Sequence, residues 1–287
     1  MTRLLLWLLR CTAVLPLPVV RALGALLGWT LYAVVGKRRR VAQINLRLCF
    51  PHWSEQQVRA CTRQCFVCFA QAWLDRGWLW YGRPAVLAQR LHLTGALAEL
   101  QGQSPTVIFA PHFVGLDAGW TALTSQLPRS FATIYTDQSN KTADAWILRG
   151  RKRFAKKGLF GRVDGTKGVV AAIKAGEPLY LLPDMNFGPH ESLFVPFYGV
   201  PAATVPSLSR FARLGRAKVV PVLCRMTARG YDIEVLLAWS NFPTTDANAD
   251  TLRMNRELEG YINTMPPQYY WVHKRFKDRP AGEQPPY

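Results

Sequence analysis

The segment VIFAPHFVGLDAG, residues 107–119, indicates both the fold and a site within it. Thr106–Ala110 is an apolar run typical of a buried strand, and it ends at a proline followed by His112. Leu116–Ser125 then has the apolar spacing of a helix. Strands that alternate with helices indicate an α/β protein, in which sites gather at the carboxyl ends of the strands. His112 stands at such an end.

The alternation of strands and helices continues along the chain. Ser54 and Gln57 have the spacing of a capping box, which predicts a long helix that reaches about Trp80. Arg229-Gly230 is expected to turn a hairpin. The predicted fold class is α/β, a single domain with a mixed sheet flanked by helices. The further predicted strands are Phe131–Tyr135, Pro178–Leu182, Lys218–Met226 and Tyr231–Ala238, and the further helices are Ala143–Lys157, Lys167–Lys174, Pro206–Leu214 and Leu252–Met265.

The composition describes a folded, strongly basic protein. The 287 residues are 49% apolar and only 19% charged, so the chain can bury a large core and is not a disordered tail. The formal net charge is +18. Such an excess indicates a polyanionic partner, and nucleic acid and anionic membrane lipid both satisfy this description.

Six cysteines are present, and three of them extend a helical apolar stripe. Val58, Cys61, Cys65, Cys68 and Ala72 recur at steps of three and four residues, which favours packing in the core. A zinc site would need a second pair of ligands at matching spacing, and none is present in the sequence. We therefore expect no metal, no disulfide framework and a reducing compartment.

The N-terminal 36 residues are almost wholly apolar and are followed by the basic cluster Lys37–Arg40. Arg10 and Arg21 interrupt the run, and the longest uncharged stretch has 15 residues, fewer than the roughly 20 that cross a bilayer. The arginines could snorkel, so a tilted spanning helix and an interfacial helix both stay open. By the positive-inside tendency, the basic cluster holds the remaining chain on the cytoplasmic side. We expect a membrane-anchoring helix in residues 1–36, followed by one folded domain in residues 37–287.

His112 and Asp117 form an H-x4-D pattern with two interpretations. A histidine can remove a proton near neutral pH when a partner fixes its tautomer, and a nearby carboxylate can be that partner. On a continuous helix this spacing would separate the two side chains by about 140°. The pair therefore needs His112 in a turn and Asp117 in the first helical turns. Alternatively, Asp117 is a first-turn acid that faces the helix dipole.

The stretch WILRGRKRFAKKG, residues 146–158, gathers basic side chains without an interleaved acid. A helical run of charge is often a solvated face. However, like charges repel one another unless an anion is bound, and the arginine fork suits a phosphate or a developing oxyanion. The basic residues concerned are Arg149, Arg151, Lys152, Arg153, Lys156, Lys157 and the later Lys167.

Residues 179–206 carry a strand that ends near Asp184 and then an apolar loop rich in proline and glycine. Asp184 is either a polar anchor of the site or a cap of a helix or turn. Phe194–Val205 is too apolar to be left in water, so it packs in the core or lines a groove for an apolar substrate. His190 and Glu191 are flanked by turn residues and are interpreted as surface positions.

Several familiar enzyme motifs are absent from the sequence. It contains no G-x-S-x-G, G-x-x-x-x-G-K-[ST], G-x-G-x-x-G or H-E-x-x-H pattern. These absences disfavour a serine hydrolase, a P-loop enzyme, a dinucleotide-dependent enzyme and a zincin.

Taken together, these motifs resemble the late acyltransferases of lipid A biosynthesis, the lauroyl and myristoyl transferases of Gram-negative bacteria. The resemblance spans nearly the whole chain. Asn186 departs from it, because many members carry a second aspartate there. The segments that carry the resemblance are INLRLCFP (44–51), HFVGLD (112–117), RGRKR (149–153), PDMNFG (183–188), FVPFYGVPAAT (194–204) and PPQYYWVHKRFKDRP (266–280).

The resemblance implies a lipid A biosynthesis acyltransferase that moves a lauroyl- or myristoyl-type chain from acyl carrier protein to a hydroxyl on an acyl chain of Kdo-lipid IVA. It implies no cofactor, an anionic lipid A precursor as partner, and attachment to the inner membrane with the catalytic domain on the cytoplasmic side. His112 would be the general base, Asp117 its orienting acid, and Arg151 or Arg153 the group that stabilises the oxyanion or holds a phosphate. The substrate-binding residues would be Arg149, Asp184, Lys167, Phe194 and Phe197.

Two alternatives stay open at this point. One is acylation of another lipid acceptor, such as a lysophospholipid or a glycolipid, although the E-G-T-R-type block of glycerol-phosphate acyltransferases is absent. The other is a basic nucleic-acid-binding protein, against which the apolar N-terminus and the apolar loop argue. The sequence does not define the length of the acyl chain or the acyl position that is modified.

Overall fold

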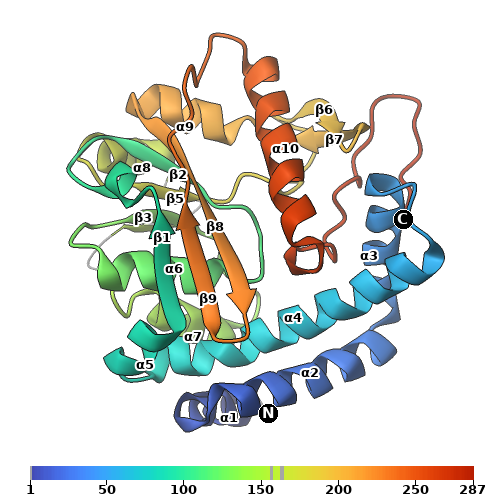
Figure 1. The fold of residues 1–287 in the computed structure, drawn as a ribbon. Helices are drawn as coiled ribbons and strands as arrows, with labels where there is room; N and C mark the ends of the chain where they lie inside the picture. Colours follow the sequence, from blue (N-terminus) through green and yellow to red (C-terminus); the bar gives the residue numbers. More distant parts are fainter. Residues whose placement is uncertain (1, 156–157, 162–164) are drawn as a thin grey trace.

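A seven-stranded mixed sheet forms the centre of the computed structural model, which describes residues 2–155, 158–161 and 165–287 (Figure 1). Neighbouring strands are parallel except β8 and β9, which form the expected antiparallel hairpin. In spatial order the strands are β1 (Leu91–Gly95), β9 (Gly230–Val235), β8 (Lys218–Thr227), β2 (Thr106–Phe109), β5 (Leu179–Leu181), β3 (Ala132–Tyr135) and β4 (Leu159–Gly161).

Helices cover both faces of this sheet, which agrees with the predicted class. They are α4 (Glu55–Tyr81), α5 (Pro84–Arg90), α6 (Leu116–Gln126), α7 (Lys141–Arg151), α8 (Thr166–Lys174), α9 (Ser207–Gly215) and α10 (Ala247–Thr264). The N-terminal helices are α1 (Thr2–Cys11), α2 (Leu17–Val34) and α3 (Gly36–Cys49), and a separate hairpin is formed by β6 (Leu193–Phe197) and β7 (Val200–Thr204).

The sheet separates two hydrophobic cores, because the side chains of each strand alternate between its two faces. In β2, Val107 and Phe109 belong to the core shared with α8, α9 and α10, whereas Ile108 belongs to the core shared with α4 to α7. Successive side chains of a strand point to opposite faces, so a strand buried on both faces reads as a continuous apolar run. This is why Thr106–Ala110 could be recognised as a buried strand.

The long helix α4 is the axis against which the N-terminal region packs. Its start is the predicted capping box, in which the Gln57 amide donates to Ser54 Oγ (3.2 Å) and the Ser54 amide donates to Gln57 Oε1 (2.8 Å). The helix α2 lies along α4 (Figure 1), and a Cβ on Gly28 would stand 2.5 Å from the Val67 Cα. Only glycine allows the two backbones to approach so closely.

Arg21 of α2 is directed into the protein, where only 12% of its side chain is exposed. Its guanidinium lies 2.9 Å from the buried carboxylate of Asp75 in α4. The same carboxylate accepts hydrogen bonds from the Tyr231 hydroxyl (2.6 Å) and the Trp78 indole (2.8 Å). A buried charge needs such partners, so Arg21 fixes α2 to the body of the protein.

The opposite face of α2 is apolar and exposed. The helix has 18 residues and a mean hydropathy of 1.5, a length and composition that would allow it to cross a membrane. A core helix of a soluble protein or a signal sequence can have the same length and hydropathy. Among the side chains that the structure describes, the large exposed apolar ones of α1, α2 and the turn between them are Leu4, Trp7, Leu8, Val14, Val19, Leu23, Leu26, Leu27, Trp29 and Val34.

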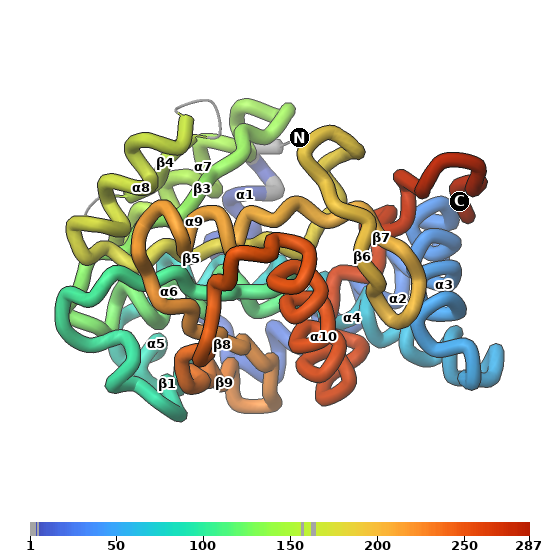
Figure 2. Tube along the Cα trace, turned by 90° about the horizontal axis from the view of Figure 1, so that it is seen from above, coloured from blue at the N-terminus to red at the C-terminus, as the bar shows by residue number. Residues whose placement is uncertain are grey.

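The helix α3 and the C-terminal segment of the chain meet at one side of the molecule. Figure 2 shows α3 beside the C-terminal segment, where the Tyr287 hydroxyl donates to Asn45 and the Asn45 amide donates to the carbonyls of Trp271 and His273 (both 2.7 Å). Residues 269–276 therefore lie between α3 and the centre of the protein.

Some predicted boundaries were wrong. The basic helix ends at Arg151 and not at Lys157, because the chain turns after it and Leu159–Gly161 joins the sheet as β4. The strands β1, β4, β6 and β7 and the helices α3 and α5 were not predicted. Lys156 and Lys157 lie outside the described residues. The cysteines are free thiols, and five of them, Cys49, Cys61, Cys65, Cys68 and Cys224, are buried, as the apolar stripe predicted for three.

Candidate active site

His112 pairs with Asp184 and not with the predicted Asp117. The His112 Nδ1 lies 2.7 Å from Asp184 Oδ1, and the His112 backbone amide donates to Asp184 Oδ2 (3.0 Å). His112 follows β2 and Asp184 follows β5, and these two strands are parallel neighbours. Their carboxyl ends meet at one edge of the sheet, which brings together residues that are distant in sequence.

The charge on Asp184 fixes the tautomer of His112. Burial alone would raise the pKa of Asp184, but the imidazole and the two hydrogen bonds from His112 outweigh it and lower the pKa. The ionised carboxylate can only accept, so the proton of the pair lies on Nδ1. The Nε2 of His112 is then the basic nitrogen, and this half-buried ring lines a cavity.

The C-terminal segment holds the histidine from the other side. The Tyr270 amide donates to the His112 carbonyl (3.1 Å), and the Tyr270 ring stacks against the imidazole at an interplanar angle of 26°. In the same segment, Nε2 of His273 accepts a hydrogen bond from the backbone amide of Asn186 (3.2 Å). Burial, together with the charge of Arg275, lowers the pKa of His273 to about 4, so it is neutral at physiological pH.

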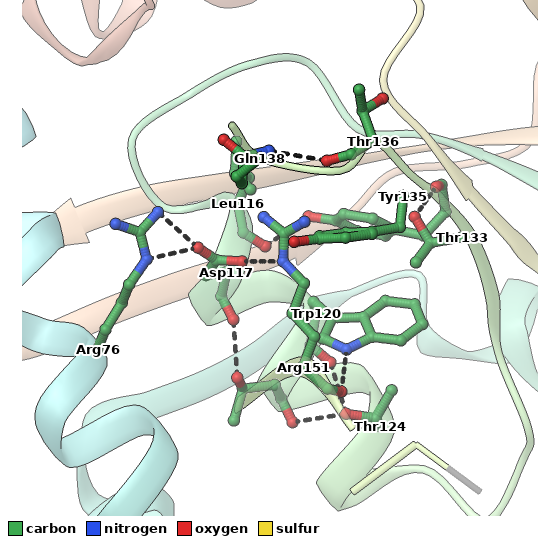
Figure 3. Close-up of polar contacts among 12 residues, drawn as sticks. Arg76, Leu116, Asp117, Trp120, Thr124, Thr133, Tyr135, Thr136, Gln138 and Arg151 are labelled. Atoms are coloured by element: carbon green, nitrogen blue, oxygen red, sulfur yellow. Dashed lines mark hydrogen bonds and ion pairs between the residues drawn. The ribbon is translucent and has the colours of Figure 1, made fainter. Parts of the chain in front are cut away.

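Asp117 lies between two arginines (Figure 3). Arg76 donates from Nε to Asp117 Oδ2 (2.8 Å), and Arg151 donates from Nε to Oδ1 (2.8 Å). Burial would raise the pKa of Asp117, but the charges and hydrogen bonds of Arg151 and Arg76 lower it to about 2. Because its oxygens are taken by these guanidinium groups, Asp117 is an anchor for the arginines.

The cavity that His112 lines has a volume of about 810 Å³, within the range of small-molecule sites. Arg76, Asp117 and Arg151 line the same space. Much of the remaining wall is apolar, and it includes Phe69, Trp73, Leu116, Trp120, Ile134, Leu182, Val205 and Phe211. The arrangement combines an oriented base, an arginine pair and an apolar wall.

The remaining predicted site residues lie elsewhere. Arg153 donates to the carbonyls of Leu79 (3.0 Å) and Gly82 (2.5 Å) and so closes the end of α4. Arg149 lines a separate groove beside Leu6, between α1 and α7. Lys167 is exposed in the first turn of α8 and is not part of the cavity wall.

The two phenylalanines of the predicted groove also lie outside the cavity wall. Phe197 is fully buried in the core, where it packs against Tyr269 and Phe276. Phe194 is exposed on β6, and only Val205 of the apolar loop reaches the cavity. The loop forms the antiparallel hairpin β6–β7. Alternate side chains of β6 are buried, as in any half-buried strand, so the apolar residues of the loop pack largely against the protein.

Sequence reasoning missed several residues of the cavity. Arg76 lies near the C-terminal end of α4, the helix that carries the cysteines. The signal in the sequence was the presence of an arginine beside the apolar positions of a buried helix. Nothing in the sequence distinguished Tyr270 except that it belongs to the segment 266–280, which carries part of the family resemblance. His190 and Glu191 are exposed as predicted, yet they also line the cavity, because their loop follows Asp184 directly. Among the described residues, no group of three His, Cys, Asp or Glu side chains could hold a metal ion.

Comparisons with known proteins agree with the resemblance drawn from the motifs. A family model described as bacterial lipid A biosynthesis acyltransferase matches residues 1–278. The lipid A biosynthesis lauroyltransferase of Escherichia coli K12 is 31% identical over 274 residues, which cover 93% of this chain and 88% of that protein. The palmitoleoyltransferase of the same strain is 29% identical (94% and 88% covered), and its myristoyltransferase is 31% identical (94% and 83% covered). The chain therefore belongs to the bacterial lipid A biosynthesis acyltransferase family and is an acyltransferase.

Proposed function

We propose that this enzyme transfers a lauroyl- or myristoyl-type chain from an acyl carrier protein thioester to a hydroxyl on an acyl chain of Kdo-lipid IVA. The single observation that carries the mechanism is the His112–Asp184 pair at the wall of a largely apolar cavity. A base oriented by a buried carboxylate suits the removal of a hydroxyl proton, and an apolar wall suits an acyl chain.

In this mechanism the Nε2 of His112 takes the proton of the acceptor hydroxyl. The oxygen attacks the thioester carbonyl, the carbon–sulfur bond breaks, and the imidazolium returns its proton to the departing thiolate. Asp184 stabilises the imidazolium while it exists, as the carboxylate of a Ser-His-Asp triad does. The acceptor oxygen is the nucleophile, so the enzyme needs no nucleophile of its own.

The surroundings suit the proposed partners. The net charge of +18 favours encounter with an acidic carrier protein and an anionic lipid. The exposed apolar faces of α1 and α2 suit contact with the inner membrane, with the remaining chain on the cytoplasmic side. In this arrangement residues 1–36 attach to the membrane and residues 37–287 carry the chemistry.

The test is mass spectrometry of lipid A from cells that lack this protein and any redundant relative. We expect lipid A that lacks one secondary acyl chain, restored by the wild-type protein and not by His112→Ala present at the same level in the membrane. Restoration by His112→Ala would refute the role of the base. Unchanged lipid A in the deletion would refute the acceptor, and a panel of lysophospholipid and glycolipid acceptors would then be assayed.

A further inference from the structure

The helix α9 has one side in the cavity wall and the other side in solvent. Ser207 and Phe211 line the cavity of the candidate active site. Arg210, Arg213 and Arg216, the residue that ends the helix, are exposed. An α-helix with its side chains is about 10–12 Å across, so a partner on the solvent side of α9 lies one helix away from the cavity.

The solvent side of α9 continues onto the neighbouring helix α8. The two helices pack closely, because a Cβ on Gly215 of α9 would stand 2.5 Å from the Ile173 Cγ2 of α8. Lys174, the next residue of α8, is exposed, and neither helix contains an acidic residue. The α9 basic surface consists of Lys174, Arg210, Arg213 and Arg216.

Neighbouring carboxylates leave this surface positive. Glu191 pairs with Arg210 (3.1 Å), and the buried Asp250 lies 3.8 Å from Arg213. These two arginine side chains are still 45% and 50% exposed. Within the described part of the chain, the other two cations of the surface form no ion pair. Like charges that stand close together repel one another, and a bound polyanion relieves this repulsion.

The place of α9 in the fold selects a soluble partner. Figure 1 shows α9 at the opposite end of the molecule from α1 and α2, whose exposed apolar faces suit a membrane. Two other basic groups lie beside those N-terminal helices, since Lys37–Arg40 follows α2 directly and Arg149 borders the groove next to α1. With α1 and α2 on a bilayer, the α9 basic surface therefore faces water.

The acidic carrier protein of the proposed function fits this surface. It is soluble, and it must bring its thioester to the cavity without entering the membrane. Contacts between exposed charges speed association more than they slow dissociation, which suits a donor that leaves after each turnover. The lipid acceptor can approach from the other side, where α4 carries Phe69 and Trp73 of the cavity wall and packs against α2.

We infer that the α9 basic surface docks the acyl carrier protein, so that the thioester enters the cavity from the side opposite the membrane. The inference rests on the proposed function for the identity of the donor. Arg210 connects the surface to the cavity, because its partner Glu191 is part of the cavity wall. The two substrates of one transfer then reach His112 from different faces of the protein.

The first experiment measures docking without catalysis. Full-length protein in detergent is titrated at low ionic strength with carrier protein that bears the phosphopantetheine arm but no acyl chain. We expect Lys174→Glu combined with Arg216→Asn to raise the Kd about tenfold or more, with an unchanged Tm. Asparagine suits position 216 because the backbone φ there is positive (49°).

The matched control makes the same change in net charge elsewhere. It combines Arg59→Glu with Arg229→Asn, which replace exposed arginines of α4 and of the β8–β9 turn. We expect this pair to leave the Kd unchanged. Equal weakening by both pairs, or by neither, would overturn the docking surface, and so would a wild type that binds no carrier protein.

The second experiment assigns the effect to one substrate. With Lys174→Glu and Arg216→Asn combined, we expect the KM of the carrier-bound donor to rise about tenfold, while kcat and the KM of the lipid acceptor stay unchanged. The KM of the same acyl chain on free pantetheine should also stay unchanged, because that thioester does not touch the α9 basic surface. A rise in the KM of the lipid acceptor would overturn the inference in favour of a site for the anionic lipid. Absence of acyl transfer from carrier protein by the wild type would instead count against the proposed function, independently of the binding result.

Discussion

His112 makes two hydrogen bonds to the carboxylate of Asp184, one from the imidazole and one from the backbone amide, although the two residues are 72 positions apart in the sequence. Two contacts to one carboxylate fix both the position of the loop and the rotation of the ring. The structure thus gives the H-x4-D histidine a partner from outside the motif. The aspartate inside the motif organises arginines.

The first prediction concerns this pair. We expect Asp184→Asn to lower kcat by about 10²–10⁴, because the amide no longer favours the Nδ1–H tautomer or the imidazolium. Steady-state acyl transfer is the measurement, with Tm as the check on folding. In a His112→Ala background the same substitution should have no further effect, since residues that act as a unit are not additive. Equal losses in both backgrounds would contradict the pairing.

Asp117 predicts a different kind of loss. Asp117→Asn leaves two guanidinium groups without their anion, so we expect the free energy of unfolding to fall by about 3–5 kcal/mol. The pKa of about 2 lies below the ordinary value of 3.8, so this contribution is complete above pH 4 and is lost as the pH falls toward 2. The Tm difference between wild type and variant should therefore stay constant from pH 8 to pH 5. Lost activity with an unchanged Tm would instead make Asp117 a purely catalytic group.

Much of this arrangement could be predicted from sequence, and the part that could not depends on the order of the strands. His112 was recognisable because a strand buried on both faces is apolar throughout and ends abruptly. Asp184 was recognisable as the end of another strand. That these two strands are neighbours follows from the packing of the whole sheet. A short motif suggested a local partner, but α6 begins at Leu116 and thereby directs Asp117 toward α4 and α7.

His273 predicts a pH dependence of stability. Its pKa in the folded protein is about 4, below the ordinary 6.5, because burial and Arg275 disfavour its charged form. Between these values the unfolded chain binds a proton that the folded chain does not, so stability falls as the pH is lowered from about 6.5 to about 4, by at most about 1.4 kcal/mol per pH unit. His273→Gln keeps an acceptor for the Asn186 amide and does not titrate. We expect its Tm to decline less than that of the wild type over this range, and parallel curves would contradict the assignment.

Substitutions of Arg151 and Arg153 should have different effects, although both residues were predicted from the sequence to have the same role. Arg153→Gln removes two hydrogen bonds to carbonyls at the end of α4, so we expect a loss of about 1–2 kcal/mol of stability with kcat unchanged at temperatures where the variant is folded. Arg151→Gln should lower kcat/KM, because Arg151 lines the cavity. Assays of both variants at one temperature, below both Tm values, make the comparison. Equal losses of kcat/KM would show that Arg153 also reaches the substrate.

The exposed face of α2 predicts where the enzyme meets the membrane. Leu26 is 68% exposed on this face, and Leu237, which follows β9, is 72% exposed. If the face of α2 enters the apolar part of the bilayer, Leu26→Glu loses the transfer free energy of a leucine, about 1.5–3 kcal/mol, and adds the cost of bringing a charge to the membrane. We expect the fraction of protein retained in washed membranes to fall about tenfold or more for Leu23→Glu combined with Leu26→Glu, and to stay unchanged for Leu237→Glu. Because Arg21 fixes α2 to Asp75 from the other side, the double variant should keep the Tm of the wild type in detergent. Unchanged retention of the double variant would place the membrane contact on another surface.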